Sequence, residues 1–237
     1  MAEVEIVVAH RERATLRVGE VFLKVDADRA RADAEVEAMA LAPVPTPRVL
    51  WRAPPVLALA ALPGTALDST ASPAAWAAAG AAARALHDAP PPPWPGPSPE
   101  EIAARLDREC AWFAADDVLP ADLLTRNRRL ADTALRPWTP VFTHGDLQAS
   151  HVFADGDAIT GVLDWSEAAP GDALSDLATL TLGREERLAD VLAGYDADVD
   201  TGLIHAWWSL RCLLVVRWLV EHGFDPRPEI AVLEARR

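Results

Sequence analysis

Residues 144–176 read HGDLQASHVFADGDAITGVLDWSEAAPGDALSD, and the interpretation of the whole chain starts from this stretch. Apolar residues lead into Asp155-Gly156, a dipeptide that favours the tight turn of a β-hairpin. Residues 159–163 then predict the returning strand. The stretch therefore predicts a short hairpin with polar residues directly before and after it.

Three polar side chains stand at the ends of this predicted hairpin. Asp146 lies on a loop before it, His151 at its start and Asp164 at its end. Because a hairpin brings its two ends together, we expect these side chains to converge. Carboxylates and an imidazole at one spot are more typical of a metal and a reacting hydroxyl than of a packed core.

The composition is that of a globular protein. The chain has 237 residues, of which 51% are hydrophobic, enough for one large domain or two small lobes with a real core. The net charge of -14 argues against nucleic acid as a partner, because no basic patch offsets it easily. An acidic protein attracts cationic small molecules, although acidity also serves solubility.

The expected location is the cytoplasm. The N-terminus MAEVEIVV lacks the basic region and cleavage site of a signal peptide, and we expect no apolar run long enough to span a bilayer. Cys110 and Cys212 are too few for a disulfide framework, so both are expected to be buried, reduced thiols. The sequence leaves the oligomeric state undecided.

The first 62 residues predict a small lobe of strands with one helix. Strands are expected at 4–8, 15–18, 21–25, 48–51 and 56–62, and a helix at 28–41. Lys24 lies in an otherwise apolar strand, either at a solvated edge or over a cleft where it meets an anion. Glu35 or Glu37 on the next helix could turn toward it, although most glutamates on such a helix are solvated.

Residues 63–237 predict a larger, mainly helical lobe. Helices are expected at 72–87, 98–115, 121–135, 174–182, 184–195 and 201–222. Ser98 and Glu101 form a capping-box pattern at the start of the second of these. In the last helix, apolar residues at helical spacing indicate a core stripe more than a cofactor site, namely Trp207, Leu210, Leu214 and Trp218.

Several common catalytic motifs are absent from the sequence. It has no GxxxxGK[ST] phosphate loop, no GxGxxG, no GxSxG and no HExxH. What remains is a strand lysine, a glutamate on the next helix, and a cluster of two aspartates and a histidine. This set meets the needs of phosphoryl transfer, in which a lysine neutralises phosphates, an aspartate takes the hydroxyl proton and further ligands hold magnesium.

Four motifs of this chain resemble the signature of the aminoglycoside phosphotransferase and choline kinase superfamily: His144-Gly145-Asp146-Leu147, Val162-Leu163-Asp164-Trp165, Gly171-Asp172 and Asp176-Leu177-Ala178. The resemblance covers nearly the whole chain, with a shortened N-lobe. It implies an α+β, two-lobed protein-kinase-like fold, with a β-rich N-lobe over residues 1–62 and a mainly helical C-lobe over 63–237.

By this resemblance Asp146 is the catalytic aspartate and Asp164 binds the metal. His151 stands where the superfamily has a metal-binding asparagine. Because magnesium prefers oxygen ligands, an imidazole there is a less natural but feasible ligand. Asp172 is either a third metal ligand or, more typically after a glycine, a turn or helix cap. Asp176 resembles the buried aspartate that braces the catalytic loop.

On the nucleotide side, the resemblance makes Lys24 the phosphate-binding lysine. Glu35 is its expected helix partner, with Glu37 the less favoured choice. Ala60 and Leu62 lie on the strand that resembles the hinge, whose backbone would hydrogen-bond adenine.

Residues 9–14, AHRERA, stand where the superfamily has a glycine-containing nucleotide loop. No glycine lets the backbone approach the phosphates there. Either Arg11 or Arg13 contacts phosphate instead, or the segment is a solvated turn.

The expected function is transfer of the γ-phosphoryl group of ATP or GTP, with Mg2+, to a hydroxyl of a small molecule. The implied acceptor is an aminoglycoside-type antibiotic or another amino alcohol, with no nucleic acid or membrane as partner. One alternative is a non-catalytic kinase-like binding protein, motivated by His151 and the missing glycine loop. A weaker one is a metal-dependent hydrolase that uses His144, Asp146 and His151.

Overall fold

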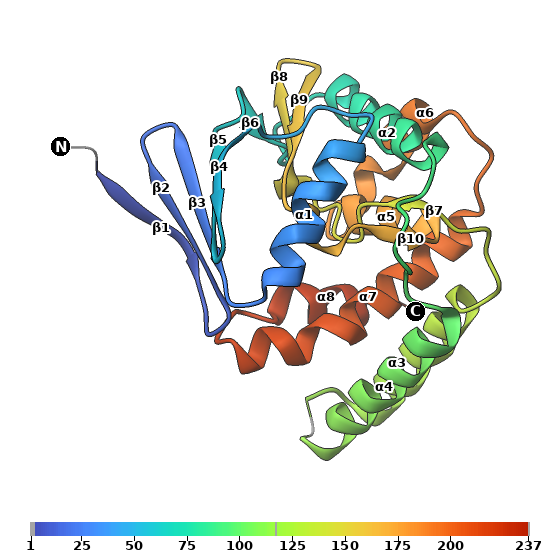
Figure 1. Ribbon diagram of the computed structural model, residues 1–237. Helices are drawn as coiled ribbons and strands as arrows, with labels where there is room; N and C mark the ends of the chain where they lie inside the picture. The colour runs from blue at the N-terminus through green and yellow to red at the C-terminus, as the bar shows by residue number, and fades with distance from the viewer. Residues whose placement is uncertain (1–2, 117, 237) are drawn as a thin grey trace.

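A computed structural model describes residues 3–116 and 118–236 as a small β-rich lobe joined to a larger helical lobe (Figure 1). This arrangement confirms the predicted α+β, two-lobed fold. The smaller lobe is a five-stranded antiparallel sheet in the order β1-β2-β3-β5-β4. Its strands are β1 (Val4–Ala9), β2 (Arg13–Val18), β3 (Val21–Asp26), β4 (Val49–Ala53) and β5 (Val56–Ala60).

Helix α1 (Arg29–Leu41) connects the sheet to the larger lobe. It begins after Asp28, whose side chain accepts hydrogen bonds from two N–H groups of the first turn. Its body packs against the short 3-10 helix η2 (Trp165–Glu167), which belongs to the larger lobe. The helix therefore lies between β3 and the segment that contains Asp164.

The larger lobe is built mainly from helices. These are α2 (Pro73–Asp88), α3 (Pro99–Ala115), α4 (Ala121–Ala134), α5 (Ala173–Thr181), α6 (Leu188–Tyr195), α7 (Thr201–Glu221) and α8 (Arg227–Ala235). Helix α2 packs against α6, and α4 packs against α7. The capping box of Ser98 and Glu101 forms as predicted.

The sequence-based prediction lacks α8 and three short strands. Strands β6 (Thr65–Ala66), β7 (Val141–Thr143) and β10 (Ala169–Gly171) are too short for a periodic pattern to show. Prolines at 226 and 228 surround the start of α8 and favour a loop in a sequence reading.

The predicted hairpin forms, with its turn shifted by one residue. Strands β8 (Val152–Asp155) and β9 (Ala158–Val162) pair antiparallel, with Asp155 opposite Ala158. The turn residues are therefore Gly156 and Asp157, not Asp155 and Gly156. The shift places glycine at the position with φ 59°, a left-handed conformation that glycine adopts without steric cost.

Helix α7 is long and apolar enough to cross a membrane by length and composition, which corrects the expectation that no such run exists. In the structure it packs against α3, α4, α5 and α8 as a core helix. Trp207 and Leu210 are buried as predicted, but Trp218 is 37% exposed. The predicted core stripe therefore ends before the last turn of the helix.

Candidate active site

Lys24 of β3 and Glu35 of α1 form an ion pair inside the smaller lobe. The lysine Nζ lies 2.5 Å from Glu35 Oε1, and both side chains are buried. Burial raises the pKa of the Glu35 carboxyl by more than the attraction of Lys24 lowers it. Because a buried ion pair adds little net stability, its main effect is to fix the position of Lys24. Glu37 is exposed, so Glu35 is the one of the two glutamates that pairs with Lys24.

Asp164 joins the two lobes, because two cations of the smaller lobe contact its carboxylate. Lys24 Nζ lies 2.9 Å and Arg13 Nη1 3.1 Å from Asp164 Oδ1. Burial alone would raise the pKa of Asp164, but these positive charges outweigh it and hold the pKa well below its usual range. The left-handed backbone of Asp164 (φ 61°, ψ 64°) is the kind of strain that concentrates at functional sites.

Arg13 is not on a solvated turn. Its Nε lies 3.2 Å from Asp26 Oδ2 and its Nη2 lies 3.0 Å from Ser166 Oγ, in addition to the contact with Asp164. The pairing of β2 with β3 could have identified Arg13. Arg13 lies opposite Asp26, and Asp26 is on the same face of β3 as Lys24, two residues further on. Where the superfamily has a glycine-containing loop, this chain therefore has the guanidinium of Arg13, which lies beside Asp164.

Asp146 lies on the loop after β7 and is surrounded by hydrogen-bond donors. Gln148 Nε2 lies 3.0 Å from each carboxylate oxygen, and Arg211 of α7 forms an ion pair with Oδ1. Burial would raise the pKa of Asp146, but Arg211 and then His151 outweigh it, so the pKa is lowered. The sequence analysis did not identify Arg211. The only feature of the sequence that points to it is its place one helical turn after Trp207, a predicted core residue.

Only one ring nitrogen of His151, Nδ1, is hydrogen-bonded within the described residues. Its Nδ1 lies 2.8 Å from the backbone carbonyl of Asp146, and a carbonyl only accepts, so Nδ1 carries a proton. The neutral ring therefore keeps an unprotonated Nε2, the form in which imidazole binds metals. The backbone carbonyl of His151 also accepts the N–H of Leu163, which brings it next to Asp164.

A buried carboxylate holds the loop that contains Asp146 in place. Asp176 of α5 accepts the N–H of His144 at 2.7 Å and the N–H of Gly145 at 3.0 Å. His87 Nε2 lies 3.2 Å from the same carboxylate, and His87 Nδ1 lies 2.9 Å from the Tyr195 hydroxyl. The predicted bracing position of Asp176 thus extends to α2 and α6 through His87 and Tyr195.

His144 and Gly145 are structural in this loop. His144 Nε2 donates to the carbonyl of Leu163, and Nδ1 accepts the N–H of Asp146, so both ring nitrogens are occupied. His144 therefore has no free lone pair for a metal. This disfavours the metal-dependent hydrolase alternative, which needs His144 at its site. Gly145 has φ 78°, and a Cβ there would lie 2.2 Å from the carbonyl oxygen of Glu167.

The strand that resembles a hinge is β5 and the residues after it. The N–H of Ala60 donates to the carbonyl of Arg48, and the N–H of Ala61 donates to the carbonyl of Glu20. A hydrogen bond between adenine and the backbone of Ala60 would therefore use the Ala60 carbonyl, because the Ala60 N–H is already occupied. The side chain of Leu62 lies against Gly161 of β9.

The donors near Asp164 fit a divalent ion that arrives with a nucleotide. In residues 3–116 and 118–236, no group of three or more His, Cys, Asp or Glu side chains is placed to hold a metal by itself. Asp164 and His151 offer one carboxylate and one imidazole. Because Mg2+ typically takes one or two protein carboxylates and completes its shell with phosphate oxygens and water, a site shared with a nucleotide does not require a third protein ligand.

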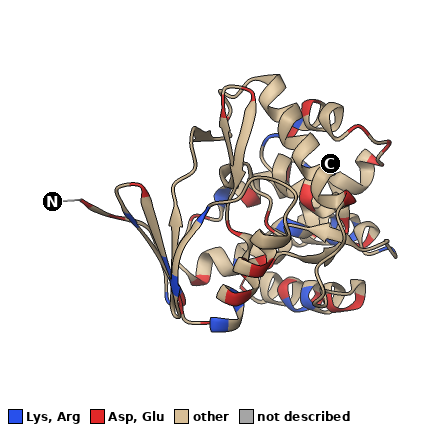
Figure 2. Ribbon diagram, turned by 45° about the horizontal axis from the view of Figure 1, so that its top comes forward, with Lys and Arg blue, Asp and Glu red and all other residues tan. Residues whose placement is uncertain are grey.

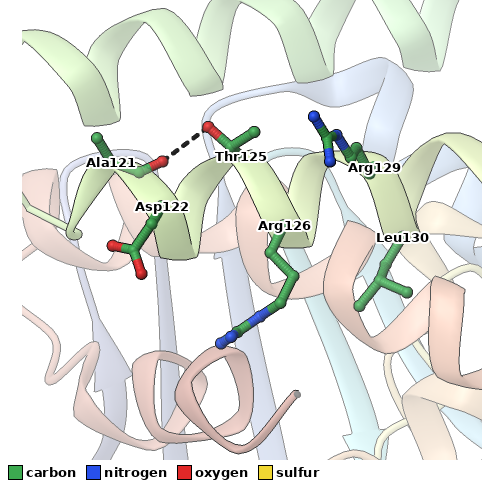
Figure 3. A pocket seen from close by; sticks show the side chains of 6 residues that line it. All are labelled: Ala121, Asp122, Thr125, Arg126, Arg129 and Leu130. Carbon is green, nitrogen blue, oxygen red and sulfur yellow. Dashed lines mark hydrogen bonds between the residues drawn. The ribbon is translucent and has the colours of Figure 1, made fainter.

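Two features lie apart from this centre. Asp172 caps α5 and also accepts hydrogen bonds from Arg136 and Trp207, so its carboxylate is used structurally and the cap alternative applies. A hollow along α4 contains none of the predicted site residues (Figure 3). It is lined by Ala121, Asp122, Thr125, Arg126, Arg129 and Leu130.

Comparisons with known proteins agree with the fold and the motifs. The model of the phosphotransferase enzyme family matches residues 5–207, whereas a search of curated proteins finds no match. A macrolide 2'-phosphotransferase of Brachybacterium faecium is 21% identical, with 99% of this chain and 91% of that chain covered and a TM-score of 0.71.

Two further solved structures hold bound nucleotide and antibiotic. An aminoglycoside phosphotransferase of Streptomyces rimosus, in complex with ADP and streptomycin, is 26% identical, with 90% of this chain and 93% of that chain covered and a TM-score of 0.69. An aminoglycoside phosphotransferase in complex with GDP and kanamycin is 18% identical, with 98% and 92% covered and a TM-score of 0.74.

These comparisons confirm the resemblance found in the sequence. The family match spans well over half of the chain, and the solved neighbours share its two-lobed fold. They favour an enzyme over the non-catalytic alternative. The chain belongs to the phosphotransferase enzyme family and is an enzyme that transfers phosphate to a hydroxyl.

Proposed function

We propose that this enzyme transfers the γ-phosphoryl group of ATP or GTP to a hydroxyl of a small molecule in the cleft between its lobes. The observation that carries the proposal is the contact of Lys24 with Asp164 at 2.9 Å, with Asp146 on the neighbouring loop. Lys24 and Arg13 provide the positive charge that nucleotide phosphates require, and Glu35 holds the lysine in place. A nearby carboxylate, Asp146, is placed to accept the hydroxyl proton.

In this proposal each residue has one task. The acceptor oxygen forms a bond to the γ-phosphorus, the bond to the β–γ bridging oxygen breaks, and the nucleoside diphosphate leaves. Asp146 orients the hydroxyl and takes its proton, while Asp164 and the Nε2 of His151 would hold a divalent ion. That ion, when bound, neutralises charge on the β- and γ-phosphates. The backbone of Ala60 and Leu62 remains the predicted adenine contact.

The acceptor and the donor are open to a direct test. Purified protein is incubated with ATP or GTP, with and without Mg2+, and a panel of hydroxylated molecules that includes the predicted aminoglycoside-type antibiotics and other amino alcohols. Mass spectrometry is expected to detect a phosphorylated acceptor only with Mg2+, and none with Lys24→Met. Tight nucleotide binding without phosphorylation of any panel member would instead favour the binding-protein alternative.

A further inference from the structure

Arg211 reaches Asp146 with most of its guanidinium unused. It forms an ion pair with Asp146 Oδ1, and within the described part of the chain the guanidinium has no other hydrogen bond or ion pair. Its Nε and Nη1 donors are therefore available to a ligand. The side chain is 28% exposed, so part of it is open to solvent.

A comparison with Arg13 shows why a purely structural role does not account for Arg211. Arg13 uses three nitrogens, on Asp26, Asp164 and Ser166, and its side chain is 12% exposed. Arg211 uses one N–H of Nη2, so one of its two donor faces, Nε with Nη2 or Nη1 with Nη2, stays free. Such a pair matches a carboxylate or a phosphate, which arginine binds through two parallel hydrogen bonds.

The position of Arg211 indicates which part of a substrate it would contact. An acceptor hydroxyl must come within hydrogen-bond distance of Asp146 to give up its proton, which places the acceptor next to Arg211. We propose that Arg211 binds an anionic group of the acceptor, a carboxylate or a phosphate, carried close to the hydroxyl that is phosphorylated. The anionic group stays unreacted and orients the hydroxyl toward Asp146. This proposal rests on the proposed function, because it takes Asp146 as the proton acceptor.

The guanidinium of Arg211 itself favours an anionic group over an ammonium group at this position. An ammonium group beside the reacting hydroxyl would lie close to the guanidinium, and like charges repel. Some nearby carboxylates are already paired, Glu221 and Glu109 with Arg217 and Asp225 with Arg227. Glu229 of α8 interacts with Arg211 and Glu167 with Asp146, and neither forms an ion pair within the described residues. Figure 2 shows the remaining acidic residues spread over many elements of both lobes. The net charge of -14 therefore does not by itself indicate a cationic substrate.

The test uses two sets of hydroxylated acceptors of similar size, each with an acid, a neutral alcohol and an amine: glucuronate, glucose and glucosamine, and glycerate, glycerol and serinol. Calorimetry measures their binding to the protein loaded with Mg2+ and a non-hydrolysable ATP analogue, and initial rates of phosphorylation are measured with ATP. The acid of each set is expected to bind at least about tenfold more tightly than the amine, the effect of one charge-assisted contact.

Variants of two arginines on α7 separate a binding role from a structural one. Arg211→Gln is expected to remove the preference for acids, and Arg211→Lys to keep part of it. Arg217→Gln is the matched control, because Arg217 pairs with Glu221 and Glu109 away from Asp146, and it should keep the wild-type preference.

Two results overturn the proposal. One is a wild type that binds the amines, or the uncharged alcohols, as tightly as the acids. The other is an Arg211→Gln variant that weakens all six acceptors by the same factor. The analogue titration in the same experiment separates these from a failure of the proposed function, in which the Mg2+–nucleotide itself does not bind.

Discussion

The two lobes meet through segments that are held by different interactions. In the larger lobe, the loop that contains Asp146 is fixed through its backbone, since His144 and Gly145 donate their N–H groups to the buried carboxylate of Asp176. In the smaller lobe, backbone hydrogen bonds close the glycine-free segment that leads into β2, and side-chain charges, chiefly those between Arg13 and Asp164, join it to the larger lobe. The first kind of contact lies within one lobe, and the second lies between the two.

This difference corresponds to the two tasks of the proposed reaction. Breaking a hydrogen-bonded buried charge costs several kcal/mol, so the catalytic loop keeps one geometry for the reacting groups. The ion pairs of Lys24 and Arg13 with Asp164 lie between the lobes, and phosphate groups could take the place of the Asp164 carboxylate in them. On the proposed function, Lys24 and Arg13 exchange Asp164 for the phosphates of the nucleotide.

The largest effect is expected from Asp146→Asn, which tests whether the chemistry belongs to the larger lobe. The amide cannot take the hydroxyl proton, so kcat should fall by about 10^3-fold, while nucleotide affinity should change little. Steady-state rates and nucleotide titrations measure the two. Asp155→Asn in the exposed part of the hairpin is the control. An Asp146→Asn enzyme with near wild-type kcat would remove Asp146 from the reaction.

Loss of the brace should have the next largest effect. Asp176→Ala leaves the buried N–H of His144, the half-buried N–H of Gly145 and His87 without their acceptor, so we expect a loss of about 3–5 kcal/mol in the free energy of unfolding. For a chain of this size the melting temperature should fall by roughly 10 °C. Denaturant and thermal unfolding measure the change. A stability equal to that of the Asp155→Ala control would show that the backbone contacts do not hold the loop.

Arg13→Gln should reduce the free energy of nucleotide binding by more than it reduces the free energy of unfolding. Removal of one charge-assisted contact to phosphate is expected to lower nucleotide affinity by about tenfold, with the effect shrinking as salt is raised. Arg11→Gln is the matched control, since Arg11 is an exposed neighbour. Equal nucleotide affinity in the two variants would mean that Arg13 is only structural.

The smallest effect concerns acid stability. The folded-state pKa of Asp164 is depressed below its ordinary value of 3.8, so its ion pairs contribute stability above that value and lose it as the pH falls. Asp164→Asn should therefore be less stable than the wild type near neutral pH, and the two stability curves should converge as the medium is acidified below about pH 4. Urea unfolding across this range measures the gap. A gap that does not narrow in acid contradicts the depressed pKa.

Features that depend on local sequence were predictable, whereas contacts between distant segments were not. The capping box of Ser98 and Glu101 and the hairpin after Asp146 follow from neighbouring residues, apart from the one-residue shift of the turn. Arg211 meets Asp146 from 65 residues away, and no spacing in the sequence relates the two. The contact between Arg13 and Asp164 depends on how the lobes meet, which a single sequence does not specify.

We propose that Lys24 and Asp164 bind a metal–nucleotide complex where the two lobes meet. The most direct test is calorimetric titration of a non-hydrolysable ATP analogue, with and without Mg2+, into the wild type and Asp164→Ala. We expect the wild type to bind more tightly with Mg2+, and Asp164→Ala to lose that Mg2+ dependence and bind at least about tenfold more weakly. Equal, Mg2+-dependent binding by both proteins, or no binding by the wild type at millimolar analogue, would contradict the account.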